Sequence, residues 1–264
     1  LALTSGGPFT KSKMGTAKVT FSAGKLGALT AYSTELTEDS MPVWAAALTA
    51  QYERTFREQT DEVLLFGDET TGTGNIANEG GTIATTARYL VLDGLIHTAL
   101  VDTTANSKDL AAALVASDVK TARGFMGTAG KYGVDVNQLV IFCDPSTYFA
   151  LTDLDEVKTV DRFGPEATIK TGALQMIDGI GIVVPEKYGL TSAAGKIHIT
   201  AANNSKGSLL LVRRDGYIVG YRRQIGMTVD RVPYSDAHYI LATARLDLGR
   251  FDAEMSAYLY DITV

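Results

Sequence analysis

The chain has 264 residues, and its 24 basic and 30 acidic side chains give a formal net charge of -6. This length can bury one large core or two modest ones. A single cysteine, Cys143, excludes an intramolecular disulfide and any multi-cysteine zinc site. No apolar run approaches the roughly 20 residues of a membrane span, and the acidic balance gives no general footprint for nucleic acid. We therefore expect no membrane partner.

The charge is unevenly distributed along the chain. Residues 1–34 contain no acidic side chain and four lysines, so that this segment carries +4, while the rest of the chain carries -10. The four lysines are Lys11, Lys13, Lys18 and Lys25. Charge alone is compatible both with a frayed, solvated tail and with a cationic segment that contacts an acidic surface. Because the chain starts at Leu1 without an initiator methionine, we also expect that it was trimmed or truncated before this point.

Residues 18–33 alternate in part between apolar and polar side chains, which predicts an extended strand or a hairpin arm. Most of these side chains are small, and an isolated hairpin is only marginally stable in water. We therefore expect this arm to be ordered only against another surface, that of a neighbouring subunit.

The clearest helix in the chain begins near Asp39–Ser40, with Pro42 in its first turn, and ends at Gly67. Apolar side chains recur on one face at a spacing of four residues, at Trp44, Leu48, Tyr52 and Phe56. At a rise of 1.5 Å per residue, the helix should be a rod of roughly 40 Å.

The rest of the chain mixes helices and strands. A glycine-rich loop at 67–81 precedes a helix that Ser107 should cap, and a short helix should start at Asp144. Apolar runs predict buried strands at 137–143, 177–184 and 208–212, and residues 226–264 are mainly strand in pattern. Because no regular βαβ repeat is present, the sequence predicts the α+β class.

Two short motifs match catalytic or cofactor patterns but lack the required context. Gly72–Ala77 fits G-x-G-x-x-A, yet a helix precedes it where a dinucleotide site needs a strand. Ser22–Lys25 fits S-x-x-K, but it lies in an expected strand and has no S-D-N or K-T-G partner. We expect neither a cofactor site nor a serine nucleophile here.

The remaining candidates are equally weak. His97, His198 and His238 lie in separate segments without metal-ligand spacing, and Cys143 lies in an apolar strand. The acidic cluster at 153–156 lacks the glycine and the distal glutamate of a calcium loop. We therefore expect no catalytic residue, no cofactor and no metal. The lack of a recognisable set of nucleophile, base and orienting residue argues against an enzyme.

The densest basic stretch contains Arg213, Arg214, Arg222, Arg223 and Arg231. Because side chains alternate between the two faces of a strand, a hairpin would divide each adjacent pair of arginines. We expect the cluster to form salt bridges between subunits, with contact to DNA as the alternative.

Several segments follow one another in an order that is informative as a whole. The run 18–40 leads into the long helix and to Phe66-Gly-Asp68. A second block contains Tyr132–Asn137, Asp144–Tyr148, Val160–Pro165, Thr171-Gly172 and Asp178–Val184. In this order, the segments resemble the major capsid proteins of tailed bacteriophages, which have the Hong Kong 97-type fold. The resemblance covers most of the chain, although no single motif is diagnostic.

The resemblance implies an α+β capsid fold in three parts. Residues 1–33 would form the N-terminal segment and the extension loop. Residues 34–100 and 221–252 would form a peripheral domain with a spine helix at about 41–66, and residues 101–220 and 253–264 an axial domain. Removal of an N-terminal scaffolding segment, common in the family, would explain a chain that begins internally.

The resemblance also implies a function without catalysis. The chain would assemble with copies of itself into hexamers and pentamers of an icosahedral shell, which encloses double-stranded DNA without sequence-specific binding. Portal, scaffolding or decoration proteins would be further partners, and the location would be the virion, assembled in the cytoplasm of a bacterial host. The four lysines of the N-terminal segment would lie across the acidic body of a neighbouring subunit.

Some members of that family form an isopeptide bond between a lysine and an asparagine, promoted by a glutamate near the C-terminal strands. Lys11 or Lys13 could supply the lysine, but the matching run Asp236–Arg245 has neither glutamate nor asparagine. We therefore expect noncovalent assembly. Two other functions stay open: an encapsulin-like shell around an enzyme cargo, and a cytosolic hydrolase or transferase whose site forms only in three dimensions.

Overall fold

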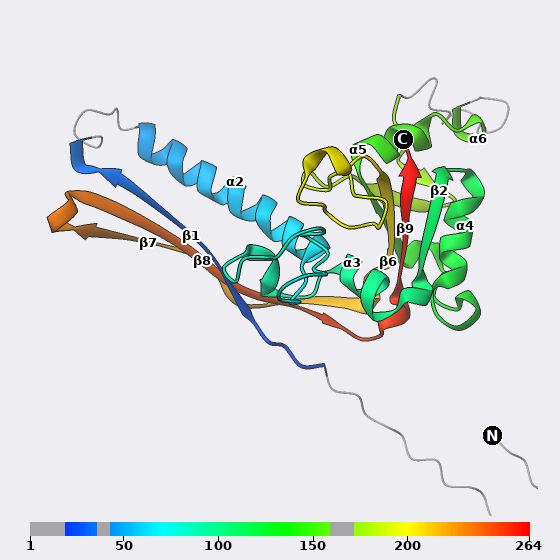
Figure 1. Ribbon diagram of the computed structural model, residues 1–264, viewed down its shortest axis with the longest axis horizontal. Helices are drawn as coiled ribbons and strands as arrows, with labels where there is room; N and C mark the ends of the chain where they lie inside the picture. The colour runs from blue at the N-terminus through cyan, green and yellow to red at the C-terminus, as the bar shows by residue number, and fades with distance from the viewer. Residues whose placement is uncertain (1–18, 36–42, 159–171) are drawn as a thin grey trace, which may run out of the picture.

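The computed structural model describes residues 19–35, 43–158 and 172–264, and it combines a long arm with a broader body (Figure 1). The arm consists of helix α2 (Val43–Phe66) and an antiparallel sheet in the order β1 (Gly24–Ser33), β8 (Ala237–Arg250), β7 (Tyr217–Val232). The chain passes from the body into the arm and back again, because β7 and β8 lie between the last two strands of the body.

The body is built on a six-stranded mixed sheet with helices on its faces. Its strand order is β2 (Ser107–Ala113), β9 (Ser256–Thr263), β6 (Gly207–Arg213), β3 (Leu139–Cys143), β5 (Ile180–Val183) and β4 (Met176–Ile177). The other helices are α3 (Leu95–His97), α4 (Ala116–Phe125), α5 (Pro145–Thr152) and α6 (Asp155–Lys158). Short helical turns connect these elements at Arg88–Val91, Thr98–Asp102, Thr104–Asn106, Thr128–Gly130, Val136–Gln138, Ala201–Asn203, Arg214–Gly216, Pro233–Ser235 and Ala253–Met255.

The predicted α+β class is confirmed, and so is the long helix over residues 43–66. Its apolar stripe packs on the three-stranded sheet, where Tyr52, Phe56 and Val63 are buried. The charged face remains in solvent, with Glu53 and Arg57 4.0 Å apart as an i,i+4 pair. The expected start of the helix at residues 39–42 lies outside the described residues.

The core of the body lies on both faces of β6 and β3. Leu209, Leu211 and Ile141 are fully buried beneath α4, α5 and neighbouring loops. On the opposite face, Phe66 from the end of α2 packs edge-on against Tyr188, with ring centroids 5.3 Å apart. Strands covered on both faces read as continuous apolar runs, which is why the sequence predicted β3 and β6 correctly.

The helix expected from Ser107 is wrong in its first part. Residues Ser107–Ala113 form strand β2, which pairs in parallel with Tyr258–Tyr260 of β9, and helix α4 begins only at Ala116. Ala111 has a left-handed φ of 47°, which a continuous helix does not allow. Pairing with a strand about 150 residues further along the chain therefore overrides the local helical pattern.

The expectation that the N-terminal arm is ordered only against a neighbour is also wrong for residues 24–33. Strand β1 pairs along its whole length with β8 of the same chain, from Gly24 opposite Leu246 to Ser33 opposite Ala237. Leu26 is 3% exposed because it lies in the core beneath α2. The chain itself therefore supplies the surface on which this strand is ordered.

Candidate assembly surface

Helix α2 covers only part of the sheet in the arm. Ile240, Ala242, Ala244 and Leu246 of the central strand β8 face the helix and are almost fully buried. Their register partners on β7 share that face, because directly paired residues of an antiparallel sheet point to the same side. The burial of these partners therefore shows how far the cover of the helix extends.

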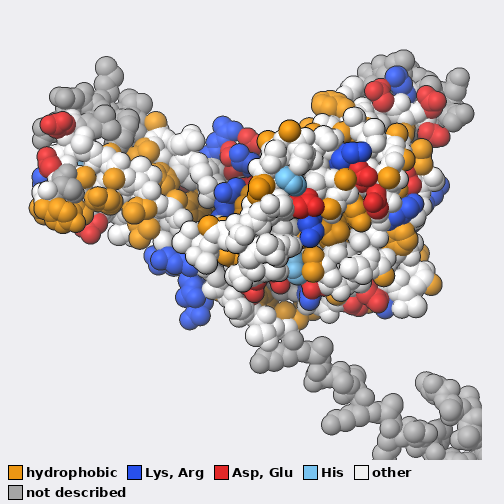
Figure 2. All heavy atoms as spheres, in the orientation of Figure 1, with side chains coloured by type: hydrophobic (Ala, Val, Ile, Leu, Met, Phe, Trp, Pro, Cys, Tyr) orange, Lys and Arg blue, Asp and Glu red, His pale blue; other side chains and the backbone are white. Residues whose placement is uncertain are grey.

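The β7 part of this face is largely open to solvent. Val229, paired with Ile240, is 57% exposed, and Met227, paired with Ala242, is 37% exposed. Tyr221 and Val219 continue the row toward the body and are also exposed. Figure 2 shows hydrophobic side chains gathered along the arm and at its far end. We call the four residues Val219, Tyr221, Met227 and Val229 the β7 apolar row.

The opposite face of the sheet also carries exposed apolar side chains. Leu29 of β1 is 62% exposed and pairs directly with Leu241 of β8, which is 40% exposed. At the tip, Tyr234 is 94% exposed in the turn between β7 and β8. Contiguous exposed apolar surface of this kind marks contact sites in soluble proteins.

Of the lysines predicted to contact a neighbour, only Lys25 lies within the described residues; Lys11, Lys13 and Lys18 lie outside them. Lys25 is exposed on β1 and pairs directly with Arg245 of β8, which in turn pairs with Arg223 of β7. The structure thus sets a row of three cationic side chains across the sheet. Like charges opposite one another weaken a sheet, so an anionic partner on this row would relieve a local repulsion.

The structure does not gather the five predicted arginines in one place. Arg213 ends β6 in the body, where it forms a two-point ion pair with Asp215, with Nε–Oδ1 and Nη2–Oδ2 distances of 2.6 and 2.9 Å. Arg214 follows in the turn to β7, and Arg222 and Arg223 lie near two β-bulges of that strand. Arg231 lies near the tip, where its Nη2 is 3.2 Å from Asp236 Oδ1.

The arginines on and beside β7 lie far apart, since the 16 residues of this strand extend over roughly 50 Å. Arg214, Arg222, Arg223 and Arg231 are exposed, whereas Arg213 is half-buried and lies over the ring of Tyr132. The five arginines therefore do not form a single patch: Arg213 lies in the body, and the other four are spread from the start of β7 to the tip of the arm.

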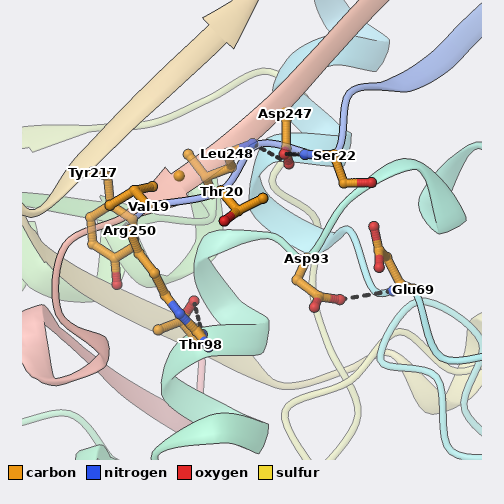
Figure 3. Close-up of a pocket in the computed structure, with 11 residues that line it drawn as sticks. Val19, Thr20, Ser22, Glu69, Asp93, Thr98, Tyr217, Asp247, Leu248 and Arg250 are labelled. Atoms are coloured by element: carbon orange, nitrogen blue, oxygen red, sulfur yellow. Dashed lines mark hydrogen bonds between the residues drawn. The ribbon is translucent and has the colours of Figure 1, made fainter. Parts of the chain in front are cut away.

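A cavity of about 330 Å³ lies where the arm meets the body (Figure 3). Three acidic side chains, Glu69, Asp93 and Asp247, line it. Burial and, secondarily, the nearby charge of Asp93 raise the pKa of the Glu69 carboxyl. Opposite them, Arg250 reaches Thr98 Oγ1 at 3.5 Å and forms an ion pair with Asp102.

Sequence reasoning missed the residues behind this cavity. His97 is buried, with Nε2 3.5 Å from Asp68 Oδ1 and 3.8 Å from Asp93 Oδ1. The spacing of Asp93 and His97, four residues apart, was a visible signal, because such pairs share one face of a helical segment. Asp68 joins them only through the tertiary fold.

The remaining candidates from the sequence are the two short motifs and Cys143. Gly72 and Gly74 both adopt left-handed φ angles in the irregular loop after α2, with neither a preceding strand nor a following helix to orient a pyrophosphate. Ser22 precedes β1 and is not on a helix. Cys143 is buried in β3, and burial raises the pKa of its thiol to about 12, so that it is a poor nucleophile.

Comparison with solved structures identifies the fold. A subunit of the satellite phage P4 procapsid, solved with its size determination (Sid) protein, superimposes with a TM-score of 0.61 over 100% of this chain and 79% of its own, at 10% identity. The chain has the Hong Kong 97-type capsid fold. At this identity, the likeness concerns the fold alone.

Two further capsid-fold structures match nearly as completely. The mature capsid of bacteriophage PhiM1 gives a TM-score of 0.52 at 12% identity, with 98% of this chain and 78% of that chain covered. The SrpI encapsulin of Synechococcus elongatus PCC 7942 gives 0.53 at 12% identity, with 91% and 74% covered. Neither a family model nor a curated protein matches the sequence.

Within the described residues, no helix is both long and apolar enough to cross a membrane.

Proposed function

We propose that this chain is the major capsid protein of a tailed, double-stranded DNA bacteriophage, and that it assembles into hexamers and pentamers of an icosahedral shell. The observation that carries the proposal is the match of the whole chain, arm and body together, to subunits of phage shells. An enzyme whose site lay in the body alone would not need the arm. In this role the protein is structural, needs no cofactor and catalyses no reaction.

The exposed surfaces of the arm support this role. A folded monomer leaves the β7 apolar row and the Leu29–Leu241 pair in solvent, where they contribute little to folding. Fully burying one such side chain is worth about 1.5 to 3 kcal/mol. Because each subunit of a closed shell repeats the same contacts with its neighbours, modest terms of this size accumulate over the particle.

The domain assignment belongs to the same proposal. All six strands of the body sheet fall within 101–220 and 253–264, the range assigned to an axial domain around the hexamer and pentamer centres. Helix α2 and most of β7 and β8 fall within 34–100 and 221–252, the range assigned to a peripheral domain. Portal, scaffolding and decoration proteins would be further partners, and the particle would assemble in the host cytoplasm.

The decisive experiment is to express the full chain and to analyse it by size-exclusion chromatography and negative-stain electron microscopy. A shell protein yields particles in the megadalton range or their capsomers, whereas an enzyme of this length yields a small oligomer. Finding only monomers and small oligomers under all assembly conditions, including addition of a coexpressed scaffolding protein, would refute the proposal.

An encapsulin-like shell is the second candidate, and the full-length match to the SrpI encapsulin favours it specifically. The two functions differ in what the particle contains. Nuclease-protected double-stranded DNA in particles purified from infected or induced cells supports the capsid, and a copurified protein cargo without DNA supports the encapsulin.

The cationic N-terminal segment has its own test. We propose that Lys11, Lys13, Lys18 and Lys25 contact acidic side chains of a neighbouring subunit, and that the joint change of all four to Glu impairs assembly while each subunit stays folded. Exposed ion pairs are individually worth about 0 to 1 kcal/mol, so only the joint change should be visible. Normal particle yield from this variant would contradict the role of the charges.

Assembly is further proposed to be noncovalent. Boiled particles should then run in SDS gels as a single band near the 28.1 kDa of one chain. A ladder of multimers would show a covalent cross-link and would overturn this part.

A further inference from the structure

The buried cluster behind the junction cavity has the geometry of a metal-binding site. One oxygen of Asp68, one oxygen of Asp93 and one ring nitrogen of His97 all lie within 4.8 Å of one another. The Nε2 atom of His97 is 3.5 Å from Asp68 Oδ1 and 3.8 Å from Asp93 Oδ1. In tetrahedral coordination with bonds of about 2.0 to 2.1 Å, ligand atoms lie about 3.3 Å apart. The two distances from Nε2 are therefore close to the required spacing, and the two carboxylate oxygens lie within 4.8 Å of each other.

His97 lacks the hydrogen bonds that a buried imidazole normally has. Its side chain is only 8% exposed, and Nδ1 has no hydrogen-bond partner. The two Nε2 contacts are longer than the roughly 2.7 to 3.2 Å of an ordinary hydrogen bond. A buried polar group without a partner costs about 1 to 3 kcal/mol. An ion bound at Nε2 would accept the lone pair of that nitrogen and fix the ring proton on Nδ1, which faces Asp102.

The surroundings of the cluster match those of metal ligands. Ligating histidines usually present their second ring nitrogen to a carboxylate, and Nδ1 of His97 lies 3.4 Å from Asp102 Oδ2. The carboxylates are held by backbone amides as well. Thr70 N and Ile76 N donate to the two oxygens of Asp68, each at 2.8 Å, and Glu69 N donates to Asp93 Oδ1 at 2.9 Å.

The cluster is also accessible from one side. Asp68 and His97 are buried, whereas the Asp93 side chain is 43% exposed and lines the junction cavity (Figure 3). Water in that cavity can complete the coordination, and an ion can enter through it. Three ligands of mixed nitrogen and oxygen type with one open position suit Zn²⁺ or a similar transition metal, whereas Mg²⁺ and Ca²⁺ prefer oxygen ligands alone.

We propose that Asp68, Asp93 and His97 bind one divalent transition-metal ion of the zinc type, with Asp102 orienting His97. The ion joins the loop that leaves α2 to the segment that leads into α3. These two segments already touch through the Gly94 N to Gly67 O hydrogen bond of 2.9 Å, at the junction of arm and body. Metal binding therefore stiffens the junction. The proposal does not rest on the shell function, because it concerns the isolated chain.

The test uses the full chain, treated with a chelator and then dialysed. Calorimetric titration with Zn²⁺ should give one ion per chain, and Co²⁺ should develop the visible absorption of a four-coordinate site. Zn²⁺ should raise the Tm saturably, and Mg²⁺ at the same concentration should not. Absence of saturable Zn²⁺ binding, or equal stabilisation by Mg²⁺, overturns the proposal.

Variants locate the ion without depending on buried residues. Asp93→Asn, at a half-exposed position, should keep the fold and weaken Zn²⁺ binding by ~100-fold, and Asp102→Asn by ~10-fold, as expected for a ligand and for the residue that orients one. The matched control is Asp247→Asn, which removes a carboxylate from the same cavity but not from the cluster and should change the affinity less than ~3-fold. Equal losses in Asp93→Asn and Asp247→Asn would show unspecific attraction to an acidic cavity and would overturn the proposal.

Discussion

Strands β6 and β7 follow one another in the chain, and both are rich in apolar residues, but they differ completely in burial. Six of the seven residues of β6 are buried, because this strand lies inside the body sheet with cover on both faces. In β7, which is an edge strand, no residue is buried. The same kind of side chain therefore stabilises the fold in one strand and is left available for contact in the next.

The difference lies in sheet position and in the reach of α2. The helix crosses β8 and β1 but leaves the β7 apolar row uncovered, although the row lies on the same face as the core beneath the helix. The body is thus complete as a folding unit, whereas the arm has a core beneath α2 and, beside it on the same face, an apolar row that no other part of the described chain covers. This contrast predicts that mutations in the two strands have separate effects, on folding in β6 and on association in β7.

Leu211→Ala in β6 should have the largest effect on subunit stability. The side chain is fully buried and pairs with Ile141 in the centre of the body sheet. Removing three heavy atoms from such a site costs about 2 to 5 kcal/mol, through the lost burial and the cavity left behind. Urea denaturation of the isolated subunit, followed by circular dichroism, measures the loss. A loss below about 1 kcal/mol would mean that the body core is not as closely packed as its burial indicates.

The elements that could be predicted from the sequence alone are those whose burial is recorded in the local pattern of residues. The spacing of apolar residues predicted α2, and continuous apolar runs predicted β3 and β6, because these patterns record burial that the elements impose locally. Asp144 was likewise recognised as a helix start, and its side chain accepts a hydrogen bond from Thr147 N at 2.9 Å. The capsid fold came from the order of segments and not from any single motif.

What the sequence could not show depends on distant partners. Strand β2 has the pattern of a helix, and only its parallel pairing with β9 fixes it as a strand. The cluster around His97 is assembled from two segments, the loop after α2 with Asp68 and the stretch from Asp93 to His97, and only the Asp93–His97 spacing is visible in sequence. The arginines form one dense stretch in the sequence, but an extended strand separates them by tens of ångströms.

Tyr132→Phe should have a smaller effect, and one that depends on pH. The Tyr132 hydroxyl donates to Asp252 Oδ2 at 2.6 Å, where the chain leaves β8 for β9, and this hydrogen bond lowers the pKa of the Asp252 carboxyl. A carboxyl whose pKa is lower in the folded than in the unfolded state stabilises the fold above the unfolded pKa of about 3.9, and this stability is lost as the pH falls through the folded value.

At pH 7, the variant should therefore lose about 0.5 kcal/mol, the lower end for a hydrogen bond because the carboxylate is partly in solvent. The difference from the parent chain should disappear once Asp252 is protonated in both, well below pH 4. Thermal unfolding at several pH values measures it. A difference that stays constant down to acid pH would assign the loss to altered packing of the ring, which also carries Lys131 and Arg213 over its faces.

Val229→Lys in the β7 apolar row should have the smallest effect on the subunit. The side chain is 57% exposed, so the lysine can extend into solvent, and the stability of the isolated chain should change by less than about 0.5 kcal/mol. Assembly should respond quite differently, because a charge buried at a contact between subunits is costly unless it finds a partner.

The informative comparison is therefore between the change in subunit stability and the change in particle yield. Particle yield from Val229→Lys should fall several-fold at unchanged subunit stability. The control Asp230→Lys changes the adjacent position, on the other face of β7, and alters the charge by two units instead of one, so it tests strictly whether added positive charge is enough. If both variants assemble equally well, the β7 apolar row is not a contact surface, and the contrast between β6 and β7 reflects only the reach of α2. If only Val229→Lys fails, the face that α2 leaves open is the one that a neighbouring subunit covers.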